Sequence, residues 1–249
     1  MKVFSVFGIT QSGKTTTIEK IITELRKRNY SVGSVKEIHY EKFAIDTVGS
    51  NTDRHKKAGS QLVTARGYYE TDILFQENLP IEKIISFYDH DYLVLEGVTD
   101  ANVPKIITAH STQEVDERID DSVFLLSGRM GDICKEYRGI EAISPFDNIE
   151  RIVDIIEETV CDLLPDFDEK CCGECGMSCE DLLHGIVKGT NVREDCQLGM
   201  HHVTLTIDGK EIPIVPFVEK ILENTIRGVV SELEGYRENG LIEIKLGME

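Results

Sequence analysis

The chain has no apolar run long enough to cross a membrane. A spanning helix needs about 18 or more consecutive apolar residues, and no stretch of this sequence approaches that length. The apolar residues near the start, 3–7, are soon followed by Gln11, Ser12 and Lys14, with no small-residue cleavage site of a secretion signal after them. We therefore expect a cytoplasmic protein with no membrane partner.

Basic residues are scarce as well. The sequence has 27 Lys and Arg against 45 Asp and Glu, which gives a formal net charge of −18. A protein that binds nucleic acid presents a basic face to the phosphate backbone, so this balance argues against nucleic acid as the main ligand. A solvated acidic surface that keeps the protein soluble explains the charge equally well.

What the sequence does contain, directly after its first apolar run, is a phosphate-binding loop. Residues 8–15 read GITQSGKT, a complete G-x-x-x-x-G-K-T motif, and residues 3–7 before it are typical of a buried strand. Apolar residues then recur at the spacing of a helix, at Ile18, Ile21, Ile22 and Leu25. This strand–loop–helix context predicts that the chain binds a nucleoside triphosphate.

The motif also predicts which residues touch the nucleotide. Backbone N–H groups of the loop and of the helix N-terminus surround the phosphates. Lys14 reaches the outer phosphates and neutralises charge during hydrolysis, while the Thr15 hydroxyl holds Mg²⁺. The predicted nucleotide-binding residues are Gly8, Gln11, Ser12, Gly13, Lys14, Thr15 and Thr16.

Strand and helix patterns alternate over the first two thirds of the chain. Strands are predicted at 30–38, 61–65, 71–75, 92–95, 105–108 and 122–126, and helices at 52–59, from residue 80 through 85, and at 147–164. This alternation predicts an α/β phosphate-loop NTPase fold with a mostly parallel sheet covered on both faces. Cys161 is expected to pack within the last of these helices as a small apolar residue.

A polar segment, 165–170, divides a nucleotide-binding domain of residues 1–165 from a second domain of residues 166–249. In the second domain we predict a hairpin with strands at 202–207 and 211–215, a helix from 216 to about 233 and a closing strand at 241–246. These elements would form a small α+β unit that could dock a partner.

Three carboxylates are candidates for metal or water positioning. Glu96 follows the apolar strand 92–95, and the carboxyl ends of parallel strands open onto the ligand crevice, so we expect it to help hold Mg²⁺. Asp46 or Asp53 could hold Mg²⁺ or position the attacking water, but each also fits a turn or a helix cap. For His90, His110 and His184 the sequence offers no convergent partner, and we expect surface roles. The sequence has no N-K-x-D or T-K-x-D segment, the motif that usually binds the guanine base in GTPases.

Five of the seven cysteines lie between positions 171 and 196. Thiols stay reduced in the cytosol, so this clustering indicates a metal site rather than disulfides. Four of them follow the spacing C-x2-C-x3-C-x16-C, namely Cys172, Cys175, Cys179 and Cys196. This set could hold a 4Fe-4S cluster, which we favour, or a tetrahedral zinc ion, or remain without metal. Cys171 could replace Cys172, whereas Cys134 and Cys161 are solitary.

Residues 1–165 resemble the MobB family, the GTP-binding accessory proteins of molybdopterin guanine dinucleotide synthesis. The resemblance rests on the segments 7–16, 35–39, 43–47, 53–59 and 93–97. It implies a homodimer that binds GTP and Mg²⁺, hydrolyses GTP weakly and works beside a MobA-type nucleotidyltransferase. It further implies that residues 8 and 13–16 bind phosphates and that Glu96 helps hold Mg²⁺.

The cysteine segment is similar to a small four-cysteine iron–sulfur module of anaerobic electron-transfer and corrinoid proteins, with residues 182–189 in the place of its short helix. Its second and third cysteines are one residue closer than in that module, which leaves zinc open. The leading interpretation is a GTP-binding protein that assists the guanylation of molybdopterin, or insertion of the dinucleotide into molybdenum or tungsten enzymes. A nucleotide-gated metallochaperone or iron–sulfur adaptor is the alternative; a small-molecule kinase is weaker, because no acceptor-site motif is visible.

Overall fold

The computed structural model describes residues 1–40, 43–166, 175–196, 203, 205–207, 210–212, 214, 216–237 and 242–244. The chain divides into two compact units. The first comprises Met1–Leu163 with Leu183–Thr190, and the second Leu164–Leu182 with Asn191–Glu249. Across the described ranges, no helix is both long and apolar enough to cross a membrane.

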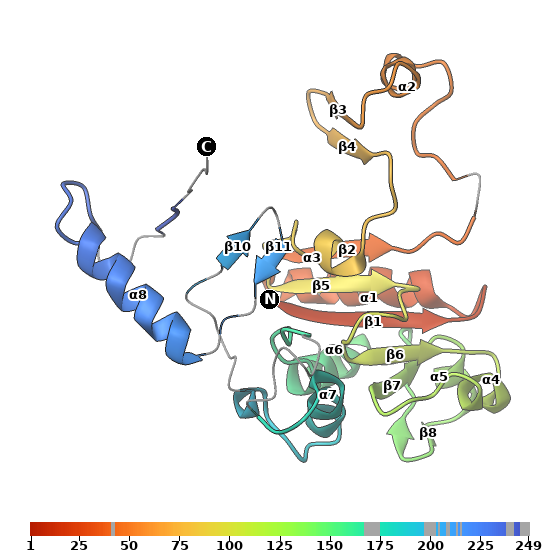
Figure 1. Cartoon of the computed structure of the whole chain (residues 1–249). Coiled ribbons are helices and arrows are strands. Elements are labelled where there is room, and N and C mark those ends of the chain that lie inside the picture. Colours follow the sequence, from red (N-terminus) through yellow and green to blue (C-terminus); the bar gives the residue numbers. More distant parts are fainter. Residues whose placement is uncertain are drawn as a thin grey trace. The chain divides into compact units, whose positions relative to one another are not determined.

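A five-stranded sheet forms the centre of the first unit, in the order β2-β5-β1-β6-β7 (Figure 1). All four strand pairs in it are parallel. The strands are β1 (Lys2–Gly8), β2 (Val32–Lys36), β5 (Tyr92–Glu96), β6 (Lys105–Thr108) and β7 (Val123–Ser127). The predicted α/β fold with a mostly parallel sheet is therefore confirmed.

Helices cover the sheet because its central strands are apolar on both faces, as parallel strands usually are. Even-numbered residues such as Phe4 and Val94 pack with α1 (Lys14–Lys27) and α6 (Ile149–Thr159), whereas Val3 and Leu93 pack on the other face with α3 (Ile81–Ile85). Shorter helices complete the unit: α2 (Asn51–Lys57), α4 (Thr112–Asp116) and α5 (Met130–Ile133). The packing fixes α1, and with it the loop that precedes it.

Two predicted strands form a separate hairpin instead of joining the main sheet. β3 (Leu62–Arg66) and β4 (Thr71–Phe75) pair antiparallel with each other. Only residues 67–70 connect them, and this turn is closed by a hydrogen bond from Gly67 N to Glu70 O. A parallel crossover needs a dozen or more residues, so the short connection requires the antiparallel pairing. A second small hairpin joins β8 (Glu136–Tyr137) to β9 (Ile140–Glu141).

Helix α6 is shorter than predicted at both ends. The Asn148 side chain caps it by accepting a hydrogen bond from Arg151 N, and the helix ends at Thr159. The chain then turns extended and pairs with its own start, where Leu163 N donates to Met1 O at 3.1 Å. The prediction that Cys161 packs within this helix was wrong, because the pairing draws residue 161 out of helical conformation.

The second unit contains β10 (Leu205–Ile207) and β11 (Lys210–Ile212), which pair antiparallel and confirm the predicted hairpin with shorter strands. Helix α8 (Pro216–Val230) follows. The short 3-10 helix η1 (Arg193–Asp195) comes before them, and so does the start of helix α7 (Cys179–Val187), whose residues from Leu183 onward belong to the first unit. The predicted closing strand at 241–246 was wrong at residues 242–244, which lie in no strand. The rest of its range and the predicted turn at 208–209 lie outside the described residues.

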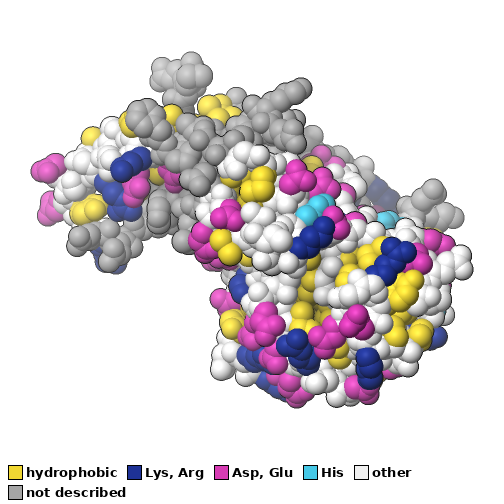
Figure 2. Space-filling model, turned by 90° about the horizontal axis from the view of Figure 1, so that it is seen from below, with side chains coloured by type: hydrophobic (Ala, Val, Ile, Leu, Met, Phe, Trp, Pro, Cys, Tyr) yellow, Lys and Arg dark blue, Asp and Glu magenta, His cyan; other side chains and the backbone are white. Residues whose placement is uncertain are grey.

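Charged side chains of both signs lie close together on the molecular surface. On the face drawn in Figure 2, Lys and Arg side chains are interspersed with Asp and Glu side chains. The described residues of that face therefore offer no continuous basic surface to a phosphate backbone.

Candidate nucleotide site

The loop between β1 and α1 is held in a tight, defined conformation. Gly8 and Gly13 have φ angles of 144° and 104°, which favour glycine. A side chain at Gly8 would also come within 1.9 Å of the Thr108 carbonyl oxygen, and one at Gly13 within 3.0 Å of Gly128 Cα. Both glycines of the motif are thus required by the close approach of β6 and of the turn after β7.

Lys14 lies over this loop. Its ammonium group donates to the carbonyl oxygen of Gly8 at 3.0 Å and to that of Ile9. Burial lowers the pKa of Lys14, and the nearby negative charge of Glu96 acts in the opposite direction. The Lys14 side chain therefore lies at the first turn of α1, where the lysine of this motif contacts phosphate oxygens.

Thr15 and Glu96, the two predicted Mg²⁺ residues of the loop and of β5, lie side by side. The Thr15 hydroxyl donates to Glu96 Oε1 at 2.8 Å, and Lys36 forms an ion pair with the same carboxylate. Glu96 is only 8% exposed. A hydroxyl and a carboxylate are oxygen donors of the kind that Mg²⁺ prefers, so the pair fits a magnesium site at the first turn of α1.

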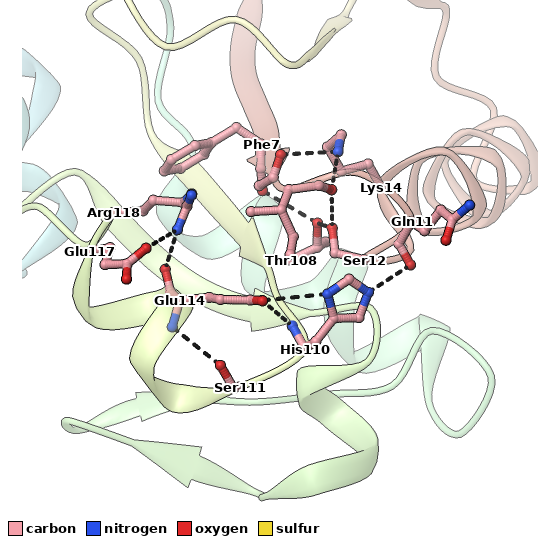
Figure 3. A network of polar contacts seen from close by, with 12 residues as sticks. Phe7, Gln11, Ser12, Lys14, Thr108, His110, Ser111, Glu114, Glu117 and Arg118 are labelled. Carbon is pink, nitrogen blue, oxygen red and sulfur yellow. Dashed lines mark hydrogen bonds and ion pairs between the residues drawn. The ribbon is translucent and has the colours of Figure 1, made fainter.

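A polar network ties the phosphate loop to the carboxyl end of β6 (Figure 3). The Ser12 hydroxyl lies 2.7 Å from the Thr108 hydroxyl. His110 Nε2 lies 3.1 Å from the Gln11 carbonyl oxygen, and since a carbonyl only accepts, this bond places a proton on Nε2. Glu114 fixes His110 in turn, by accepting its backbone N–H at 2.7 Å and lying 3.5 Å from Nδ1.

The sequence offered no partner for His110, and the structure places one at the phosphate loop, although the His110 side chain stays 29% exposed. Its imidazole supports Gln11, which has a φ of 62° that is unusual for a residue other than glycine. The two residues are 99 positions apart and meet only because β1 and β6 pair in parallel. No sequence pattern pointed to this contact.

Asp46 and Asp53 are both engaged around α2. Asp46 accepts from Ser50 at 2.8 Å and Thr52 at 2.9 Å and pairs with Lys56 at 2.8 Å. Asp53 accepts from Gly49 N at 2.7 Å and pairs with Lys57 at 2.6 Å. These contacts belong to a helix-capping arrangement, and a role for either carboxylate at Mg²⁺ or water stays a prediction.

The cysteine site is described only in part. Cys175, Cys179 and Cys196 belong to the second unit, whereas Cys171 and Cys172 lie outside the described residues. Cys179 begins α7, and Cys196 is buried directly after η1. Within the described ranges, no group of three or more His, Cys, Asp or Glu side chains is placed to hold a metal ion.

Comparison with known proteins points in one direction. The profile of the family described as molybdopterin guanine dinucleotide synthesis protein B, MobB, matches residues 3–126. A Methanocaldococcus jannaschii protein, provisionally named a molybdopterin-guanine dinucleotide biosynthesis adapter protein, is 28% identical over 253 residues, which cover 99% of this chain and 97% of that protein. The Haemophilus influenzae molybdopterin-guanine dinucleotide biosynthesis adapter protein is 30% identical over 107 residues, 41% of this chain and 60% of its own length.

Solved structures agree in fold. The crystal structure of Bacillus subtilis MobB has a TM-score of 0.54 and 20% identity, and the match covers 66% of this chain and 100% of that one. The likeness therefore supports a shared α/β fold. The archaeal relative extends the sequence similarity through the second unit as well.

The contact between His110 and Gln11 predicts that replacing His110 weakens nucleotide binding. The His110→Ala variant loses a hydrogen bond of about 1 kcal/mol that supports the loop, so its Kd for a nucleoside triphosphate should rise about fivefold in titration calorimetry. His90→Ala serves as the control, because His90 precedes β5 at the end opposite Glu96. Equal affinities of the wild type and the His110 variant would contradict this role.

The contacts of Asp46 predict a pH effect on α2. Hydrogen bonds from Lys56, and then from Ser50 and Thr52, lower the pKa of Asp46 from 3.8 to about 2. Since the folded pKa is depressed, the stabilisation is fully present above pH 3.8 and disappears as the pH falls toward 2. The 13C shift of the Asp46 side-chain carboxyl should therefore titrate with a midpoint near 2 in the wild type.

The Lys56→Met variant removes the largest of these effects and should move that midpoint upward, toward 3.8. The Asp46→Asn variant should show no such transition. A wild-type midpoint at 3.8 would show that Asp46 is not held by Lys56.

Proposed function

We propose that the chain is a member of the MobB family and a GTP-binding adapter protein in the biosynthesis of the molybdopterin guanine dinucleotide cofactor. The family profile runs from β1 into β7 and so includes the complete phosphate loop. The observation that carries the proposal is the buried Glu96 hydrogen-bonded to Thr15 beside that loop. This arrangement suits a nucleotide that arrives with Mg²⁺.

Each residue of the site would contact a different part of the bound GTP and Mg²⁺. Backbone N–H groups of residues 8–16 and the N-terminus of α1 would hold the phosphates. Lys14 would release the carbonyl oxygens of its own loop and donate to the outer phosphates. Thr15 and Glu96 would hold Mg²⁺, and Lys36, which already pairs with Glu96, would balance the carboxylate charge.

Hydrolysis of GTP by this chain is expected to be weak. Lys14 and the bound Mg²⁺ would neutralise the charge that develops on the phosphate. Water would be positioned by a carboxylate, with Asp53 and Asp46 as the candidates. Both are held by contacts around α2, so we expect a slow rate unless that segment rearranges.

The partners follow from the adapter role. They are molybdopterin or its guanine dinucleotide, a MobA-type nucleotidyltransferase, and the molybdenum or tungsten enzymes that receive the cofactor. We also propose a homodimer. Large apolar side chains are exposed around α2 and the β3–β4 hairpin, at Ile45, Val48, Tyr68, Tyr69 and Ile73, and exposed apolar patches mark interaction surfaces.

We infer, as a second candidate function, an iron–sulfur module in the second unit that docks or regulates client enzymes. Support comes from the four-cysteine spacing, from the position of Cys179 at the start of α7 and from the burial of Cys196. Thiolates at such positions could ligate a 4Fe-4S cluster, with zinc as the alternative. A nucleotide-gated metal or cluster carrier would use the same two sites.

Titration calorimetry with GTP and Mg²⁺ tests the main function. The wild type should bind GTP, and the Lys14→Ala variant should bind it roughly 10- to 100-fold more weakly, because hydrogen bonds to charged phosphate oxygens are lost. Lys27→Ala is a matched control at the far end of α1. An unchanged Kd for Lys14→Ala would overturn the assignment of the site.

Anaerobic purification with iron, sulfide and zinc analysis tests the second function. We expect a brown protein with about four irons per chain. The Cys179→Ser variant should lose that iron, and Cys134→Ser, at a solitary cysteine of the first unit, should keep it. A colourless protein with one zinc ion per chain would show that the site holds zinc and not a cluster. A protein without metal would overturn the proposal.

A further inference from the structure

The turn that follows β7 lies directly against the phosphate loop. Arg129 N donates to the Ser12 carbonyl oxygen at 3.2 Å. The neighbouring Gly128 lies so close that a side chain there would come within 2.3 Å of the same oxygen. The carboxyl end of β7 therefore borders the place where the motif binds phosphates.

A further segment, residues 142–147, continues this edge. Ala142 forms a parallel bridge with Leu126. Ile143 N donates to Leu126 O at 3.0 Å, and Ser127 Oγ donates to Ile143 O at 2.9 Å. The segment thus extends the parallel arrangement by one position, and its carboxyl end points to the same side as those of β1, β6 and β7. Ligands of parallel sheets bind on that side.

Phe146 stands at the end of this segment. Its side chain is 71% exposed, although the two residues before it, Ser144 and Pro145, are buried. Asp147 N donates to Ser144 O at 3.1 Å and turns the chain toward α6. The Phe146 ring is therefore exposed to solvent on a turn that is held by a hydrogen bond and by buried neighbours.

The ring of Phe146 also lies beside α1. Lys20 Nζ is 4.7 Å from its centroid, within the range of a cation–π contact. Lys20 follows Thr16 by four residues, so the two share one face of α1. At a rise of about 1.5 Å per residue, Lys20 lies roughly 9 Å along the helix from Lys14. The α-phosphate and ribose of a nucleotide together bridge a gap of this order between outer phosphates at Lys14 and a base beside Phe146.

We propose that Phe146, together with Lys20, forms the surface on which the purine base of the bound nucleotide stacks. The inference rests on the proposed function, because it needs a nucleoside triphosphate in the phosphate loop. The sequence has no N-K-x-D segment to bind the base, and an exposed aromatic ring next to a cation is suited to stacking a flat, electron-rich base.

Binding measurements with two ligands test this surface. The Phe146→Ala variant should bind Mg²⁺·GTP about tenfold more weakly than the wild type, within the range of one lost base–aromatic stack. Its affinity for Mg²⁺·tripolyphosphate, which has no base, should be unchanged, and this also shows that the variant folds. Phe146→Tyr should restore GTP binding, and Phe87→Ala, another exposed phenylalanine, should have no effect.

Fluorescence gives an independent readout, because the chain contains no tryptophan. The Phe146→Trp variant therefore carries a single tryptophan at the proposed surface. GTP should quench its emission by stacking, whereas tripolyphosphate should not.

The outcomes separate this inference from the proposed function. If the wild type binds neither GTP nor tripolyphosphate, both are overturned. If the wild type binds GTP but Phe146→Ala binds it equally well, and GTP leaves the tryptophan emission unchanged, only the stacking surface is overturned.

Discussion

The phosphate loop is pressed so closely against its neighbours that only glycine fits at its two turning points. Gly8 meets the Thr108 carbonyl of β6, and Gly13 meets Gly128 after β7. Strands β1, β6 and β7 must therefore keep their parallel order and register for the loop to exist in this form. The apolar faces of the sheet, buried under α1, α6 and α3, maintain that register.

The parallel register of the sheet also sets the positions of the charged side chains Glu96 and Lys36. On the other side of β1, the register sets Val6 opposite Glu96 and Glu96 opposite Lys36. A carboxylate buried beside the first turn of α1 is tolerable because a hydroxyl and an ammonium group both contact it. These contacts keep the Glu96 carboxylate paired at the proposed site even when no Mg²⁺ is bound.

The sequence predicted the parts of this site that depend on local pattern. The G-x-x-x-x-G-K-T motif predicted the loop, and the rule for carboxyl ends of strands led to Glu96, which the structure places against Thr15. The end of α6 was predicted less well, because its length is limited by the pairing of Leu163 with Met1, a contact that no helical periodicity encodes.

Residues that depend on strand order were missed for a related reason. His110 contacts the loop only because β6 lies beside β1, and Phe146 approaches α1 only because Ala142 and Ile143 bind to the edge strand β7. Neither neighbour relation follows from strand spacing alone. The cysteines are a different case, since their spacing suggests a metal centre while part of the set lies outside the described residues.

The central claim is that Thr15 and Glu96 hold Mg²⁺ beside the phosphates. The most direct measurement is the GTP affinity of the wild type and of Glu96→Gln, each with and without Mg²⁺. The wild type should gain affinity from Mg²⁺, and the variant should lose most of that gain, about 10-fold or more, while binding GTP without Mg²⁺ as before. A variant that keeps the full gain from Mg²⁺ would contradict the account.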